Sequence, residues 1–118
     1  NIDKLVQSKE KSTLTYKQIM QQLSEGYFML QEGVVNQDKL PIRIGLDKIL
    51  NHPAPSYKPW IIVKDQDKEG FKQTLLYYDQ QLHNTGKDIE QSLDTNNWIQ
   101  INKNIYNLSK LCVNCHTT

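Results

Sequence analysis

Hydrophobic side chains recur along the first third of the chain at spacings of three and four residues. From residue 16 onward this apolar stripe comprises Tyr16, Met20, Leu23, Tyr27, Leu30 and Val34. Such alternation places one apolar face along an α-helix. Ser12 or Thr13 is suited to cap its start, and Gly33, Asn36 and Asp38 mark its end. The pattern therefore predicts an amphipathic first helix.

A second helix is predicted over residues 38–52. Asp38 can cap it, and Pro41 falls in the first turn, where proline is tolerated. Leu46, Ile49 and Leu50 are expected to face inward. Residues 52–60 (HPAPSYKPW) are then too rich in proline for a helix, and residues 60–63 (WIIV) are expected to form an apolar loop packed on the bundle.

The second half of the chain predicts two further helices. The third runs from about Asp67 to Leu93, with its stripe at Phe71, Leu75, Tyr78, Leu82, Thr85, Ile89 and Leu93. After a break at residues 94–97, where Thr95 or Asn96 is the expected cap, the stripe of the last helix is Trp98, Ile101, Ile105, Leu108, Cys112 and Cys115. The two cysteines are thus expected to continue a buried face. The prediction is an all-α, antiparallel, up-down-up-down four-helix bundle with a long proline-rich connection between helices two and three.

Composition supports one domain over residues 1–118. The chain is 37% hydrophobic and 23% charged, with a formal net charge of +1. This balance gives no reason to expect nucleic acid as a partner. No apolar run approaches the ~20 residues of a membrane-spanning helix, so no membrane-spanning segment is expected.

The only two cysteines of the chain lie in the sequence CVNCH at residues 112–116. Zinc needs four ligands, and the other histidines, His52 at a predicted helix end and His83 on a predicted solvated surface, are not in paired motifs. A thioredoxin-like dithiol opens a helix, where the dipole lowers the thiol pKa, whereas this pair closes one. A disulfide within one helix constrains little. The sequence disfavours these three interpretations without excluding them.

The remaining interpretation uses every residue of the motif, because C-x-x-C-H is typical of c-type haem attachment. Cys112 and Cys115 share one helical face, so both thiols can form thioethers with one macrocycle. His116 is then adjacent as the proximal iron ligand. The residues therefore predict one covalently bound haem c, with its iron.

With this motif on the last of four predicted helices, the chain resembles the class II c-type cytochromes, which include cytochrome c′ and the low-spin cytochromes c-556. The resemblance covers residues 14–116 and rests on CVNCH, on TYKQIMQQLSEGYFML at residues 15–30 and on the long connection before the third helix. It implies a four-helix bundle with thioethers at Cys112 and Cys115 and with His116 as proximal ligand. It also implies that the residue on the distal haem face comes from the first helix.

Met20 is the candidate for that distal position. In an up-down-up-down bundle the start of the first helix lies beside the end of the last, and Met20 is roughly 10 Å along the first helix. We expect its sulfur to ligate the iron, the alternative being an ordinary core methionine. Tyr16, one turn earlier, is expected to line the haem pocket, whereas Met29 lies off the stripe.

Two functions follow from the ligation of the iron. With His/Met ligation both axial positions are filled, and the protein is expected to carry single electrons between redox partner proteins. If Met20 stays in the core, a five-coordinate iron of the cytochrome c′ type would bind NO or CO at an apolar distal face. An enzyme is not expected, because no His or Arg lies on the distal stretch of the first helix.

The haem interpretation also predicts location and assembly. Bacterial chains receive covalent haem on the periplasmic side, so we expect a periplasmic protein whose signal peptide has been removed; such removal would account for a chain that starts at Asn1. Members of the resembling family commonly dimerise through the first two helices. Phe28 and Val35 lie off the inward stripe and suit a homodimer interface.

Overall fold

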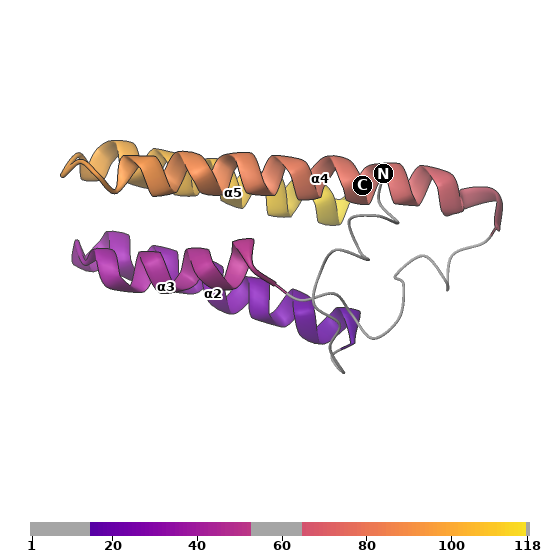
Figure 1. Cartoon of the computed structure of the whole chain (residues 1–118), viewed down its shortest axis with the longest axis horizontal. Coiled ribbons are helices and arrows are strands. Elements are labelled where there is room, and N and C mark those ends of the chain that lie inside the picture. Colours follow the sequence, from indigo (N-terminus) through magenta and orange to yellow (C-terminus); the bar gives the residue numbers. More distant parts are fainter. Residues whose placement is uncertain (1–14, 53–64, 118) are drawn as a thin grey trace.

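The computed structural model describes residues 15–52 and 65–117, and within these ranges all side chains except those of Tyr16, His116 and Thr117. The described residues form helices α2 (Tyr16–Asn36), α3 (Lys39–Leu50), α4 (Asp65–Ser92) and α5 (Trp98–Thr117) (Figure 1). No strand occurs among them. The predicted all-helical class with four helices is thus confirmed for this part of the chain. The proline-rich connection and the apolar segment WIIV fall at residues 53–64, outside the described residues.

Both ends of α2 are fixed by polar contacts of the backbone. Thr15 caps the start, because its hydroxyl accepts from the Gln18 amide at 3.2 Å while the Gln18 side chain accepts from the Thr15 amide at 2.8 Å. The predicted caps Ser12 and Thr13 were therefore wrong. At the other end Gln37 is left-handed, with φ of 51°, and its amide donates to the carbonyl oxygens of Gly33 and Val34.

The caps of the later helices follow the same chemistry. The Asp38 carboxylate accepts from the Leu40 amide at 3.0 Å at the start of α3, as predicted. At the start of α5 the cap is Asn97, whose side-chain oxygen accepts from the Gln100 amide at 3.1 Å. The predicted cap Thr95 instead accepts from the Asn97 amide at 3.2 Å, so it shapes the turn that precedes the helix.

Helices α2 and α3 form a closely packed hairpin that crosses at two glycines. A Cβ atom added to Gly26 would lie 2.8 Å from the Gly45 carbonyl oxygen, and one added to Gly45 would collide with the Gly26 carbonyl oxygen. Further along, Gly33 lies directly against Ile42. The absence of side chains at these positions lets the two backbones touch, as in other close helix crossings.

Helices α4 and α5 form the second hairpin, which lies alongside the first (Figure 1). The Asn104 side chain donates to the Asp88 carbonyl oxygen at 3.4 Å, which fixes the level of one helix against the other. The Leu50 side chain of α3 packs against Gly86 of α4, and the Lys39 ammonium donates to Asn96 at 3.0 Å. Between the hairpins, α2 contacts α5 and α3 contacts α4, and each of these helix pairs is in less extensive contact than the two helices within a hairpin.

The buried core draws on all four helices. Its buried members are Leu30, Ile42, Leu46, Ile49, Ile89, Leu93, Ile101, Ile105 and Leu108, with Leu23, Tyr27, Val34, Leu82 and Trp98 packed partly buried against them. The predicted stripe of the first helix is therefore mostly half-buried. The α3-facing side of α2, with Gly26 and Gly33, was missed because glycine leaves no trace in a hydrophobic pattern. None of the helices in the described part of the chain has both the length and the apolar character needed to cross a membrane.

Candidate functional site

The two cysteines lie in the last turns of α5, three residues apart on one continuous helix. Both are free thiols; Cys112 is exposed and Cys115 is half-buried. The expectation that they continue the buried face was therefore wrong. Complete burial along this face of α5 ends at Leu108.

The short length of α3 explains why burial stops there. Helix α3 has 12 residues against 20 in α5, and its last residue, Leu50, packs against Gly86 of α4. The Asn104–Asp88 contact puts Gly86, two residues back along α4, at the level of about residue 106 of α5. The turns of α5 beyond this level extend past the end of α3. Cys112 and Cys115 thus lie where one of the four helices no longer contributes cover.

The pKa shifts of the two thiols bear on whether the pair could act as a redox dithiol. Partial desolvation by neighbouring atoms raises the pKa of Cys112 and of Cys115, and the nearby Cys115 raises the pKa of Cys112 further. A catalytic redox dithiol needs the opposite shift, because its thiolate is the nucleophile. The electrostatics of this pair therefore argue against a thioredoxin-like role.

His116 follows Cys115 within the last turn of α5, so its backbone belongs to the same helical segment as both thiols. Its imidazole and the phenol of Tyr16 lie outside the described side chains. Their predicted roles, as iron ligand and as pocket lining, remain predictions.

Met20 is half-buried on α2. It precedes Leu23 by three residues and Tyr27 by seven, and these two side chains pack against the core. Met20 therefore continues the side of α2 that meets the core, rather than its outer surface. The start of α2 and the end of α5 lie toward the same end of the molecule (Figure 1), and the two helices contact one another. This is the relation between Met20 and the cysteine motif on which the sequence prediction depends.

The residues at this end fit a covalently bound haem by their chemistry. Two thiols, an adjacent histidine and a thioether form a donor set suited to haem attachment and iron ligation. The neighbouring stretches carry half-buried apolar side chains, namely Leu23 of α2, Phe71 and Leu75 of α4 and Leu111 of α5. Such side chains can cover a flat apolar macrocycle, and no buried side-chain polar atom of the described residues lacks a hydrogen-bond partner.

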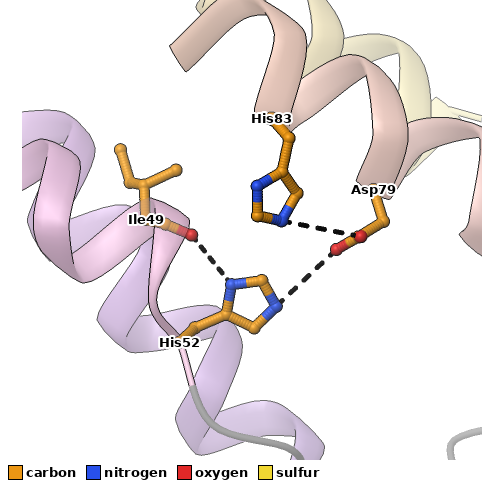
Figure 2. Close-up of polar contacts among 4 residues, drawn as sticks. All are labelled: Ile49, His52, Asp79 and His83. Carbon is orange, nitrogen blue, oxygen red and sulfur yellow. Dashed lines mark hydrogen bonds and ion pairs between the residues drawn. The ribbon is translucent and has the colours of Figure 1, made fainter. Parts of the chain in front are cut away.

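The structure also assembles a polar cluster that the sequence interpretation missed. His52, just beyond α3, and His83 of α4 both direct their Nε2 atoms at the carboxylate of Asp79, as Figure 2 shows. His52 lies at a helix end as predicted. The side chain of His83 is 34% exposed, and the prediction of a solvated His83 missed its contact with Asp79. The spacing of four residues between Asp79 and His83 was the available signal, whereas the approach of His52 depends on how the two hairpins pack.

Within residues 15–52 and 65–117, no group of three or more His, Cys, Asp or Glu side chains is arranged to hold a metal ion. Comparison of the chain with protein-family models, curated proteins and solved structures finds no significant match. The CVNCH motif and the arrangement of α2 and α5 are therefore the features that bear on function.

Proposed function

We propose that this chain is a monohaem c-type cytochrome of the class II kind that carries single electrons. The observation that carries the proposal is the CVNCH sequence in the last turns of a continuous α5, at the end of the molecule where α2 begins. Residues three apart on a helix lie on one face, so both thiols can reach the same macrocycle. The exposure of Cys112 and the partial exposure of Cys115 leave both sulfur atoms accessible for attachment.

Each residue of the site has a distinct task in this proposal. Cys112 and Cys115 would each add sulfur and hydrogen across one vinyl group, which consumes no electrons and would fix the macrocycle to α5. His116 would hold the iron through an imidazole nitrogen, and Met20 of α2 would add its thioether sulfur as the second protein ligand. When bound, the haem supplies one-electron exchange between the ferric and ferrous states.

The half-buried apolar side chains around the site control access to it. Leu23, Phe71, Leu75 and Leu111 line the neighbouring stretches of three helices and would exclude water from the faces of the macrocycle. Tyr16, one turn before Met20, belongs to the same lining in this proposal. Burial in apolar surroundings and methionine ligation both favour the neutral, reduced state of the iron centre and so raise its reduction potential.

The proposal extends to architecture and location. The four helices complete an antiparallel up-down-up-down bundle, with the haem held between α2 and α5. The protein acts in the periplasm after export and removal of a signal peptide, and exchanges electrons with redox partner proteins. Phe28 and Val35 are 63% and 80% exposed, which supports their proposed use in a homodimer interface.

A second candidate function arises from the surroundings of Met20. Met20 lies in line with Leu23 and Tyr27, and an ordinary core methionine would occupy the same position. The adjacent Ile19 is only 2% exposed, so the same stretch of α2 is apolar. Without ligation by Met20, a five-coordinate iron would offer this apolar side to NO or CO.

Optical spectra of protein matured in a host with the covalent-attachment machinery test both candidates. We expect a sharp low-spin α-band on reduction, a weak sulfur-to-iron band in the oxidised protein, and no change with CO. Met20→Leu should abolish the sulfur band and create CO binding, while Met29→Leu, on the same helix, serves as the matched control and should leave the spectrum unchanged. A high-spin spectrum that responds to CO in the unmodified protein would instead establish the gas-binding candidate.

Covalent attachment is tested separately by denaturing electrophoresis with haem staining. The haem should remain on the unmodified chain, and Cys112→Ala combined with Cys115→Ala should remove it completely. Well-folded protein that never acquires haem in the competent host would overturn the proposal.

A further inference from the structure

We propose that His52, Asp79 and His83 form a proton-dependent clasp that holds the α2–α3 hairpin against α4. The Asp79 carboxylate lies between two imidazoles that come from the two hairpins (Figure 2). One oxygen is 3.8 Å from Nε2 of His52, and the other is 3.7 Å from Nε2 of His83. The inference concerns the packing of the helices, goes beyond the proposed electron carrier and requires no haem.

The clasp is largely removed from water. The side chains of His52 and Asp79 are 12% and 17% exposed, while that of His83 is 34% exposed. A carboxylate in such surroundings loses much of its hydration and is stable only with a compensating partner. The two imidazoles are the groups that the structure directs at its two oxygens. Their protonation therefore decides whether the charge of Asp79 is compensated.

The backbone fixes which nitrogen of His52 carries hydrogen in the neutral ring. Nδ1 lies 2.8 Å from the Ile49 carbonyl oxygen, which can only accept, so Nδ1 is the donor (Figure 2). In neutral His52 the Nε2 atom then presents a lone pair to the Asp79 carboxylate, and the contact is unfavourable. In the imidazolium form both nitrogens are donors, and the same geometry becomes an ion pair.

His83 reinforces the contact from within α4. It lies four residues after Asp79, on the same side of the helix, and its Nε2 reaches the oxygen that His52 leaves free. The two imidazoles can thus act on the carboxylate together. Only the His52 contact joins the two hairpins, so the two histidines have separable effects.

Asp47, Lys48 and Lys110 have partners away from the clasp. On α3, Asp47 accepts from the Asn51 side chain, and Lys48 pairs with Glu25 of α2 at 3.9 Å. On α5 the charged side chains of residues 98–115 are Lys103 and Lys110, and Lys110 lies over the Tyr106 ring. Within α4, Asp79 and His83 face one another. Among the described residues, none of these other groups forms an ion pair with Asp79, so none competes there with the imidazoles.

The position of the clasp allows it to affect the whole contact between the two hairpins. It lies beside the contact of Leu50 with Gly86, at the end of α3 opposite the Lys39–Asn96 hydrogen bond. Because the folded state favours the charged imidazole, the clasp stabilises fully below the ordinary imidazole titration near pH 6.5. The stabilisation disappears as the pH rises through the titration of His52 in the folded protein. Alkaline conditions therefore loosen the hairpins.

Urea unfolding of the full chain between pH 5.5 and pH 8 tests the clasp. The ratio of the wild-type unfolding constant to that of His52→Gln should rise roughly three- to tenfold from pH 5.5 to pH 8. A difference of one unit between the pKa of a group in the folded and unfolded states changes the unfolding constant tenfold. Asp79→Asn should remove the same dependence. Using differences between variants cancels the titration of His116. Glu25→Gln, which breaks the exposed Lys48–Glu25 pair, is the matched control and should leave the pH dependence intact.

Measuring the protonation of His52 directly in the wild type avoids the use of variants that could lose structure for other reasons. Nuclear magnetic resonance titration of the wild type should show His52 charging at a higher pH than a histidine in the urea-unfolded chain. If His52 titrates at the same pH in both states, or if His52→Gln leaves the pH dependence unchanged, the clasp does not exist. Because neither experiment requires haem, failure of the clasp is distinguishable from failure of the proposed electron carrier.

Discussion

Two regions of this molecule are packed in different ways. Where α2 and α3 cross, Gly26 and Gly45 bring two backbones together, and Leu30 and Ile42 are fully buried. Toward the end of α5, Cys112 is exposed and Leu111 is half-buried. The α2–α3 crossing is thus ordered by direct contacts between its own helices. The other region keeps apolar and sulfur side chains partly accessible, as the proposed haem site would require.

This contrast separates the residues that stabilise the fold from the residues of the candidate haem site. The glycine crossing and the core around Leu30 would be needed whether or not haem is bound. The cysteine end has few fully buried positions, so substitutions there should cost little in folding while, on the proposed function, they prevent haem attachment. The clasp at His52 and Asp79 lies between the two regions, where α3 ends.

The largest expected effect comes from breaking the glycine crossing. A side chain at Gly45 would collide with the Gly26 carbonyl oxygen and lie 3.1 Å from Leu30 Cδ2. Backbone cannot move aside as a flexible side chain does, so Gly45→Val should lower the free energy of unfolding by at least about 4 kcal/mol. Urea unfolding followed by circular dichroism measures this loss.

The matched control for Gly45→Val is a helical glycine without neighbours. A Cβ atom at Gly70 of α4 would have nothing within 4 Å. Gly70→Ala should therefore stabilise the chain by up to about 1 kcal/mol through its better helix propensity. Equal and small effects at both glycines would mean that α2 and α3 do not cross as closely as described.

The hydrophobic pattern predicted the existence and approximate limits of all four helices, because long three-four periodicities seldom arise without a helix. The same pattern could not find the crossing, since Gly26, Gly33 and Gly45 contribute nothing to hydrophobicity. It assigned the first stripe to the core, whereas Tyr27 and Val34 are only partly buried. The side of α2 that contacts α3 is determined by backbone proximity, which appears only when both helices are placed.

The candidate site shows a similar division. The spacing of Cys112, Cys115 and His116 was evident from the sequence, because motif chemistry is local. Their exposure was not, since it depends on where α3 ends relative to α5. The approach of His52 to Asp79 was likewise inaccessible, because it joins residues from different hairpins across the connection at 53–64.

A paired leucine truncation sharpens the comparison with a smaller effect. Leu30 has no exposed surface, so Leu30→Ala should cost about 3 kcal/mol in unfolding free energy through lost burial and a cavity. Leu111 is half-buried, and Leu111→Ala should cost about 1 kcal/mol in the haem-free chain. Similar losses at both positions, measured by the same urea titration, would show that the cysteine end is packed as firmly as the core.

The smallest effect concerns the reactivity of Cys112 in the haem-free chain. Partial desolvation, followed by the influence of Cys115, raises the pKa of this thiol, so less thiolate is present at pH 8 than in a free cysteine. Alkylation of Cys112 by iodoacetamide should therefore be several-fold slower than that of glutathione, and its rate should still be rising at pH 9. Cys115→Ala removes one contribution to the shift, so Cys112 should react faster in that variant. If Cys112 reacts faster than glutathione at pH 8, its pKa is lowered rather than raised. That result would favour a redox dithiol and weaken the case for haem attachment at Cys112 and Cys115.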